Sequence, residues 1–254
     1  MEPILKVENL TKVFSRSGQE DFTAVNSICF NLSPGECLGI IGESGSGKTT
    51  AVNMITRLLD ATDGKILLDG EDITHLKGKD LRRVYRKMQM VFQTPTDSFD
   101  PRRTLGDGIG ESLRNIGMSR KETREEVERL LGKCGLPADF ADRYPHQVSG
   151  GQCQRAAIAR ALAVKPRLLI CDEATSALDV TVQKEILELL NELRSQQGNS
   201  LSILFICHDL SLVQQFCDRV LVMYHGIIVE EGIPNEVIGH PKNAYTQRLI
   251  DSVL

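Results

Sequence analysis

A glycine-rich segment between an apolar run and a helix-like pattern constrains the fold of this 254-residue chain more than any other feature. The segment reads Gly42-Glu43-Ser44-Gly45-Ser46-Gly47-Lys48-Thr49 and fits the pattern G-x-x-x-x-G-K-[ST]. The apolar run before it, Cys37–Ile41, is typical of a buried strand. After it, apolar residues recur at helical spacing, at Ala51, Val52, Met54, Ile55, Leu58 and Leu59. Strand, glycine-rich turn and helix in this order predict an α/β fold with a phosphate-binding loop.

The residue types of this segment suit phosphate chemistry. Backbone N–H groups of such a turn converge on phosphate oxygens at a helix N-terminus, where the helix dipole adds partial positive charge. We expect the segment and the next residue, Thr50, to contact phosphate, with Lys48 on the outer phosphates and Thr49 on Mg²⁺. The alternative is a glycine-rich turn that binds nothing, and the intact pattern between strand and helix disfavours it.

Two adjacent carboxylates follow another apolar run, residues 168–171. They are Asp172 and Glu173, at the carboxyl end of a predicted buried strand, which is the edge where α/β sheets bind ligands. Asp172 would hold Mg²⁺, and Glu173 would orient or deprotonate the water that attacks a γ-phosphate. Taken alone, such a pair is more often a solvated strand end, so the prediction depends on the upstream loop.

The segment Ser149-Gly150-Gly151-Gln152 opens a predicted helix that continues through Ala156, Ala157, Ile158, Ala161 and Leu162. Ser149 and Gln152 fit a capping box, so a well-capped helix is the simpler interpretation. Two glycines in a first helical turn, however, cost about 1 kcal/mol each relative to alanine. That cost favours a helix N-terminus whose backbone approaches an anion closely.

The rest of the chain alternates strand-like runs with helical patterns, which predicts a mostly parallel sheet covered by helices. Residues 105–163 lack a strand signal, and Ser119 with Glu122 forms a second capping-box pattern there, before a helix that Gly135 and Pro137 stop. We therefore expect an all-helical insert. The first 70 residues contain β-rich pieces and turn signals that predict a small antiparallel sheet. The strand-like runs are residues 37–41, 91–92, 168–171, 202–207 and 220–224, and the β-rich pieces are residues 4–7, 24–32 and 65–68.

Composition narrows the function classes. The formal charge of -4 provides no global basic field for nucleic acid or an anionic membrane. The basic run of residues 77–87 is interleaved with few aromatics, which favours a solvated helix face over a nucleic-acid patch. Seven cysteines without a C-x-x-C pair indicate reduced, mostly buried thiols. Neither a signal peptide nor a membrane span is expected, so we predict a cytosolic protein.

The ordered motifs make the chain resemble the ATP-binding subunits of ABC transporters. The resemblance covers nearly all of the sequence and implies a P-loop NTPase fold, with a mostly parallel core sheet, an N-terminal antiparallel β subdomain and an inserted α-helical subdomain. It implies one domain, in which residues 1–93 and 165–254 form the nucleotide-binding core and residues from about 94 to 164 the helical subdomain. The motifs are the glycine-rich loop, Gln93, the signature at residues 149–152, the Asp172-Glu173 pair, Ser176-Ala177-Leu178-Asp179, and His208.

The resemblance also implies roles for individual residues, with ATP and Mg²⁺ as ligands. Phe14 would stack on adenine, Gln93 would sense Mg²⁺ and a membrane partner, Asp179 would lie in a loop that communicates across a dimer, and His208 would contact the γ-phosphate. Ser149, Gly150, Gly151 and Gln152 would complete the ATP site of a second subunit. Four of these residues have simpler explanations when each is taken alone. They would be a core phenylalanine (Phe14), a residue that ends a strand (Gln93), a helix cap (Asp179) and a hydrogen-bonded residue at a strand end (His208).

Further segments are similar to the ATPases of peptide and nickel importers. These segments are residues 93–102, 176–183, 222–224 and 240–246, although Thr94, Phe99 and Val148 depart from the usual residues. The implied protein is an ATPase that energises import of a peptide, nickel or a metal chelate. It would work at the cytoplasmic face of the cell membrane, without nucleic acid, in a head-to-tail pair with an identical or related ATPase. Its other partners would be two transmembrane permease subunits and, indirectly, an extracytoplasmic solute-binding protein.

A soluble ABC ATPase that powers no transport is the alternative. The example most similar to peptide importer ATPases is a component of phosphonate C–P lyase. That component would be expected to have Gly-Gly where this chain has Ser176-Ala177.

Overall fold

The computed structural model describes residues 2–15, 18, 20–174, 178–195 and 201–252. Backbone contacts divide the chain into two compact units, which are described separately. The first comprises Met1–Tyr85 and Ser200–Leu254, and the second comprises Arg86–Asn199. The predicted helical subdomain falls inside the second unit, and its boundaries stay a prediction. None of the helices in the described part of the chain combines the length and apolar character needed to cross a bilayer.

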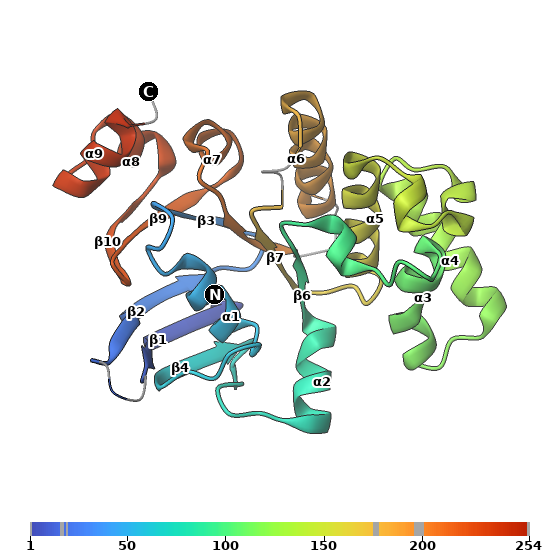
Figure 1. Ribbon diagram of the computed structural model, residues 1–254, viewed down its shortest axis with the longest axis horizontal. Coiled ribbons are helices and arrows are strands. Elements are labelled where there is room, and N and C mark those ends of the chain that lie inside the picture. Colours follow the sequence, from blue (N-terminus) through green and yellow to red (C-terminus); the bar gives the residue numbers. More distant parts are fainter. Residues whose placement is uncertain (1, 16–17, 19, 175–177, 196–200, 253–254) are drawn as a thin grey trace. The chain divides into compact units, whose positions relative to one another are not determined.

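The first unit contains the predicted antiparallel sheet, with strand order β2-β1-β4-β5. Figure 1 shows β2, β1 and β4 side by side. Its strands are β1 (Leu5–Phe14), β2 (Phe22–Leu32), β4 (Asp63–Leu68) and β5 (Glu71–Asp72). The sequence analysis found only residues 4–7 of β1, because register shifts between Val7 and Val13 interrupt the two-residue alternation on which it relied.

A second group of strands in this unit leads into the glycine-rich loop. Strand β3 (Cys37–Ile41) pairs in parallel with β8 (Ser202–Ile206) and with β9 (Arg219–Tyr224), and β10 (Ile227–Gly232) runs antiparallel to β9. Every residue of β3 and β8 is buried, which explains why β3 and, after Ser202, the rest of β8 are apolar runs in the sequence. The helices of the unit are α1 (Lys48–Ile55), α7 (Leu210–Phe216), α8 (Pro234–Gly239) and α9 (Ala244–Asp251).

Helix α1 is shorter than its apolar pattern predicted. It ends at Ile55, and Arg57 adopts a left-handed backbone conformation with φ of 60°. Leu58 therefore lies beyond the helix and is 59% exposed. The prediction that Leu58 and Leu59 continue the helix was wrong, because the chain turns toward β4 before it reaches them.

The second unit contains one parallel strand pair and most of the helical mass. Strand β6 (Met88–Val91) pairs with β7 (Leu168–Asp172), and Val91 lies opposite Cys171. Residues 92–167 are all described and contain no strand, which confirms the predicted all-helical insert (Figure 1). Its helices are η1 (Pro95–Ser98), α3 (Leu105–Asn115), α4 (Arg120–Lys133), η2 (Ala138–Asp142), η3 (Pro145–Gln147) and α5 (Gly150–Leu162), and α6 (Val180–Ser195) follows β7.

Two further sequence predictions are confirmed at the level of single side chains. Ser119 caps α4, where its hydroxyl accepts from Glu122 N–H at 3.3 Å and Glu122 accepts from Ser119 N–H at 2.9 Å. The basic run lies mostly on α2 (Gly78–Lys87), whose only buried residue is Val84; this exposure fits a solvated helix face, and that interpretation stays a prediction. None of the seven cysteines, all of which lie in the described part of the chain, forms a disulfide, and all except Cys29 are buried.

Candidate functional site

The glycine-rich loop, residues 42–49 and hereafter the phosphate loop, connects β3 to α1 in a conformation that only glycine fits. Gly42 has φ of 147°, and a Cβ there would lie 2.2 Å from the carbonyl oxygen of Met223. Gly47 has φ of 106°, and its Cβ would lie 2.6 Å from the carbonyl oxygen of Ala24. In both cases the added Cβ would clash with a backbone atom, which cannot rotate away as a flexible side chain can. The loop is thus held tightly between β9 and β2.

Lys48 is buried inside the phosphate loop. Its ammonium donates to the carbonyl oxygens of Gly42 at 2.6 Å and Glu43 at 2.8 Å, and to the Ser46 hydroxyl at 3.4 Å. The N-cap of α1, Gly47, has no side-chain cap, and the first turn contains no acidic residue. The N–H groups of this turn and the helix dipole therefore favour an anion at the N-terminus of α1, and the Lys48 ammonium lies in the same loop.

Phe14 and His208 also belong to the first unit. Phe14 ends β1 and is 37% exposed, with the Lys12 ammonium 5.1 Å from the ring centroid, so it is not a core residue. His208 is exposed and lies between the end of β8 and Asp209, which caps α7. Both side chains are accessible to a ligand of this unit.

The carboxylate pair stands at the end of β7 in the second unit. Asp172 is the last residue of the strand and is 9% exposed, whereas Glu173 is half-buried with φ of 47°. A left-handed conformation is uncommon outside glycine and costs energy, and such strain is frequent at functional sites. Gln93 is exposed two residues after the end of β6. Since β6 and β7 are parallel, Gln93 and the two carboxylates follow the same edge of the strand pair.

The signature, residues 149–152, opens α5 as a capping box. The Ser149 hydroxyl accepts from Gln152 N–H at 3.3 Å, and Gln152 accepts from Ser149 N–H at 2.9 Å. A Cβ at Gly151 would lie 2.7 Å from a methyl of Val182 on α6, so packing within the chain already requires this glycine. A Cβ at Gly150 would meet no atom of the described residues closer than 3.9 Å. As far as these residues show, the face of the helix N-terminus at Gly150 is therefore the open one.

Asp179 caps α6, where its carboxylate accepts from Val182 N–H at 3.0 Å. The simple explanation of this residue, a helix cap, thus holds, and any contact with a second subunit is additional. Ser176 and Ala177, which the sequence analysis placed in the same motif, lie outside the described residues.

Sequence-predicted residues therefore form two groups, one in each unit. Among the described residues, no cluster of three or more His, Cys, Asp or Glu side chains is arranged to hold a metal ion. Mg²⁺ is usually held by one or two carboxylates together with substrate phosphates, so Asp172 and the Thr49 hydroxyl are suitable oxygen donors. The first group is Phe14, the phosphate loop and His208, and the second is Gln93, the signature, Asp172, Glu173 and Asp179.

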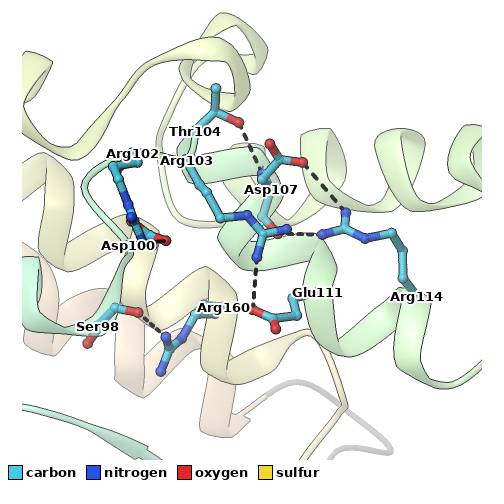
Figure 2. A network of polar contacts seen from close by, with 9 residues as sticks. All are labelled: Ser98, Asp100, Arg102, Arg103, Thr104, Asp107, Glu111, Arg114 and Arg160. Carbon is cyan, nitrogen blue, oxygen red and sulfur yellow. Dashed lines mark hydrogen bonds and ion pairs between the residues drawn. The ribbon is translucent and has the colours of Figure 1, made fainter.

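The second unit also contains an arginine-lined groove that no sequence pattern predicted. This groove of about 600 Å³ lies along α3, α4 and η2, and its described lining includes Arg103, Arg114, Arg120 and Arg124 together with the acids Asp107 and Asp142. Figure 2 shows part of its lining: Arg103 pairs with Glu111 at 3.8 Å, and Arg114 with Asp107 at 3.9 Å. Below it, Arg160 donates to the Ser98 carbonyl oxygen. The arginines are dispersed in sequence, so no local pattern signals the groove.

Comparisons with known proteins agree with this fold and these motifs. The model of the ABC transporter family matches residues 25–176. The chain is 45% identical to the oligopeptide transport ATP-binding protein OppF of Salmonella typhimurium, over 91% of this chain and 69% of that protein. It is 46% identical to AppF, an oligopeptide transport ATP-binding protein of Bacillus subtilis, over 99% and 78%.

Among solved structures, a dimeric post-hydrolysis state of the ATP-binding cassette MJ0796 with ADP and Pi superposes with a TM-score of 0.82. The sequence identity is 32%, over 91% of this chain and 98% of that one. This match confirms the expected P-loop NTPase fold of an ABC ATPase. The chain therefore belongs to the ABC transporter family, as an ATP-binding subunit that hydrolyses ATP.

Proposed function

We propose that this chain is the ATPase subunit of a peptide importer, and that residues 42–50 hold the phosphates of ATP. The observation that carries the nucleotide site is the buried Lys48 ammonium inside the phosphate loop, at an N-terminus of α1 that no side chain caps. The names of OppF and AppF support peptides as the solute and import as the process. Because both relatives are transport proteins, a C–P lyase component is disfavoured.

ATP binding replaces contacts that the loop makes with itself. The Lys48 ammonium leaves the carbonyl oxygens of Gly42 and Glu43 for the outer phosphates, and the N–H groups of the first turn of α1 donate to phosphate oxygens. Phe14 stacks on adenine, since its ring is exposed at the end of β1 beside Lys12. These exchanges keep the ammonium paired in both states.

Hydrolysis uses the residues at the strand ends. The Thr49 hydroxyl, the Asp172 carboxylate and the Gln93 amide oxygen are the groups that would hold Mg²⁺, which would neutralise phosphate charge. Glu173 accepts a proton from the attacking water, the water oxygen bonds to the γ-phosphorus, and the bond to the departing ADP oxygen breaks. His208 donates a hydrogen bond to a γ-phosphate oxygen. Glu173 thus acts on the water, and Asp172 acts on the metal.

A second ATPase subunit, identical or related, completes each site in a head-to-tail pair. The open face at Gly150 and the first-turn N–H groups of α5 are suited to the γ-phosphate bound by the partner, and Asp179 lies at the start of the next helix. The dimeric state of MJ0796 supports this arrangement.

The membrane partners are two permease subunits, which hold this chain at the cytoplasmic face of the membrane. A solute-binding protein outside the cell delivers the peptide to these permeases. We assign the arginine-lined groove to a permease segment that carries carboxylates. Arg103, Arg114 and Arg124 are ion-paired with acids of the same unit. Arg120 has no ion pair among the described residues, so its guanidinium is the charge that such a segment complements. Arg120→Glu should therefore lose co-purification with the permeases, whereas Lys121→Glu, on the next residue of α4 and outside the groove, should retain it. Equal retention by both variants would remove this assignment.

The importer function is tested by peptide uptake in a strain that has no other peptide importer. Deletion of this gene should abolish uptake of a labelled peptide, and the wild-type chain should restore it. Glu173→Gln should not restore uptake, whereas Glu188→Gln, at an exposed position of α6, should restore it fully. Unchanged peptide uptake after deletion, together with lost growth on phosphonate, would establish the lyase alternative instead.

A further inference from the structure

We propose that Tyr245 is a positioning residue for the phosphate loop, which it holds through a hydrogen bond to the second residue of the loop. The backbone N–H of Glu43 donates to the Tyr245 hydroxyl at 3.0 Å, although the two residues are 202 positions apart. The inference rests on the proposed role of the loop in binding ATP phosphates. It adds a residue from the C-terminal helix α9, which no motif of the nucleotide site includes.

The Tyr245 ring is fixed on the strand that already confines the loop. Tyr245 is buried, and its ring stacks on Tyr224, the last residue of β9, with the centroids 3.9 Å apart. The preceding residue of β9, Met223, provides the carbonyl oxygen that excludes any side chain at Gly42. The start of the loop is therefore held on one side by the end of β9 and on the other by the tyrosine hydroxyl.

Hydrogen bonds also fix the start of α9. The Glu230 carboxylate on β10 accepts from the N–H groups of Lys242 at 2.8 Å and Asn243 at 3.1 Å. The Asn243 side chain then caps α9 and accepts from Tyr245 N–H at 2.8 Å. The position of the Tyr245 hydroxyl is thus set by β9 and β10 rather than by the loop it contacts.

Glu43 is the residue through which this contact acts on the loop. While its N–H donates to Tyr245, its carbonyl oxygen accepts from the Lys48 ammonium at 2.8 Å and from Ser46 N–H at 3.2 Å. Burial raises the pKa of the Tyr245 hydroxyl, so the hydroxyl stays neutral at physiological pH. Fixing the N–H of Glu43 restricts rotation of the Gly42–Glu43 peptide plane and so holds the main chain at the start of the loop, which stays in place when Lys48 moves from the carbonyl oxygens to phosphate. Tyr245 thereby favours the loop conformation that receives phosphate.

Tyr245→Phe tests this role because it removes only the hydroxyl and keeps the stacked ring. A neutral hydrogen bond contributes enough to change a local equilibrium by about two- to tenfold, and ATP affinity falls by the same factor as the competent loop conformation becomes rarer. Equilibrium titration of the isolated chain should give a Kd for ATP raised two- to tenfold. Tyr224→Phe, which changes the other ring of the stack, should bind as the wild type does.

Two further measurements separate positioning from general destabilisation. Hydrogen exchange at the Glu43 amide should accelerate in Tyr245→Phe without nucleotide, while exchange in the core strand β8 stays unchanged. In the assembled transporter, the KM for ATP should rise while kcat at saturating ATP stays within about twofold. A merely structural role would instead lower kcat with the folded fraction and leave the affinity of the folded molecules unchanged.

The outcomes distinguish failure of this inference from failure of the proposed nucleotide site. If Lys48→Ala abolishes ATP binding but folded Tyr245→Phe binds ATP with wild-type affinity and unchanged exchange at Glu43, the positioning role is refuted and the site stands. If Lys48→Ala binds ATP as the wild type does, the loop assignment itself fails.

Discussion

Substitution of Gly47 by alanine tests whether the backbone of β2 dictates the shape of the phosphate loop. Gly45→Ala is the matched control, because Gly45 lies in the same loop with φ of 80° but a Cβ there meets no atom of the described residues within 4 Å. In Gly47→Ala, by contrast, the new Cβ starts 2.6 Å from the Ala24 carbonyl oxygen and 3.3 Å from the Gly226 Cα. The two variants share the change in residue type and differ in the contact.

The expected changes in the free energy of unfolding follow from the backbone strain that both variants share and from the close contact that only Gly47→Ala creates. A left-handed conformation costs an alanine roughly 1–2 kcal/mol, and the reduced entropy of the unfolded chain returns about 0.4–1 kcal/mol. Gly45→Ala should therefore lower the free energy of unfolding by about 0–1.5 kcal/mol. Gly47→Ala adds an overpacking cost of about 1–3 kcal/mol, since a backbone carbonyl must move to relieve the contact.

Urea unfolding of the nucleotide-free chain, followed by far-ultraviolet circular dichroism, measures the difference directly. The chain has no tryptophan, so backbone dichroism is the suitable signal. Gly47→Ala should be less stable than Gly45→Ala by about 1–3 kcal/mol. Equal stability of the two variants would show that the loop yields freely at Gly47, and the argument that β2 fixes its shape would be refuted.

Three further substitutions address the proposed roles of single residues. Lys48→Ala should abolish ATP binding in an equilibrium titration while far-ultraviolet dichroism stays that of the wild type, because the loop loses its only ammonium; retained affinity would contradict the phosphate role. Glu173→Gln should bind ATP and accumulate as an ATP-bound dimer in size-exclusion chromatography. Its ATP turnover should be reduced about 10²–10⁴-fold, because an amide cannot accept the proton from water. A hydrolysis rate above about a tenth of the wild-type rate would exclude Glu173 as the base. Ser149→Arg should bind ATP normally as an isolated chain yet fail to dimerise, because the signature contacts the nucleotide of the partner subunit. Ser119→Arg, which loses an equivalent cap on α4, should still dimerise. Weakened ATP binding by the isolated Ser149→Arg chain would indicate that the signature serves the ATP site of its own chain.

The sequence by itself determined the features that depend on neighbouring residues. The buried strand β3, the glycine-rich turn and α1 follow one another directly, so the apolar run, the glycines and the Lys-Thr pair fall within one short window. The capping boxes at Ser119 and Ser149 are likewise local, because a side chain three residues away supplies each partner. Such patterns also revealed the all-helical insert, since helical spacing extends over many residues.

Only the tertiary structure decided the contacts between segments that lie far apart in the sequence. The bulges of β1, the packing of Gly151 on Val182 and the arginine-lined groove all depend on segments that no local pattern relates. The same holds for the bond between Glu43 and Tyr245, which joins the phosphate loop to a helix about 200 residues later. Spacing along the chain predicts what a residue does with its near neighbours, whereas contacts across such distances arise only when strands pair and side chains fill the space between them.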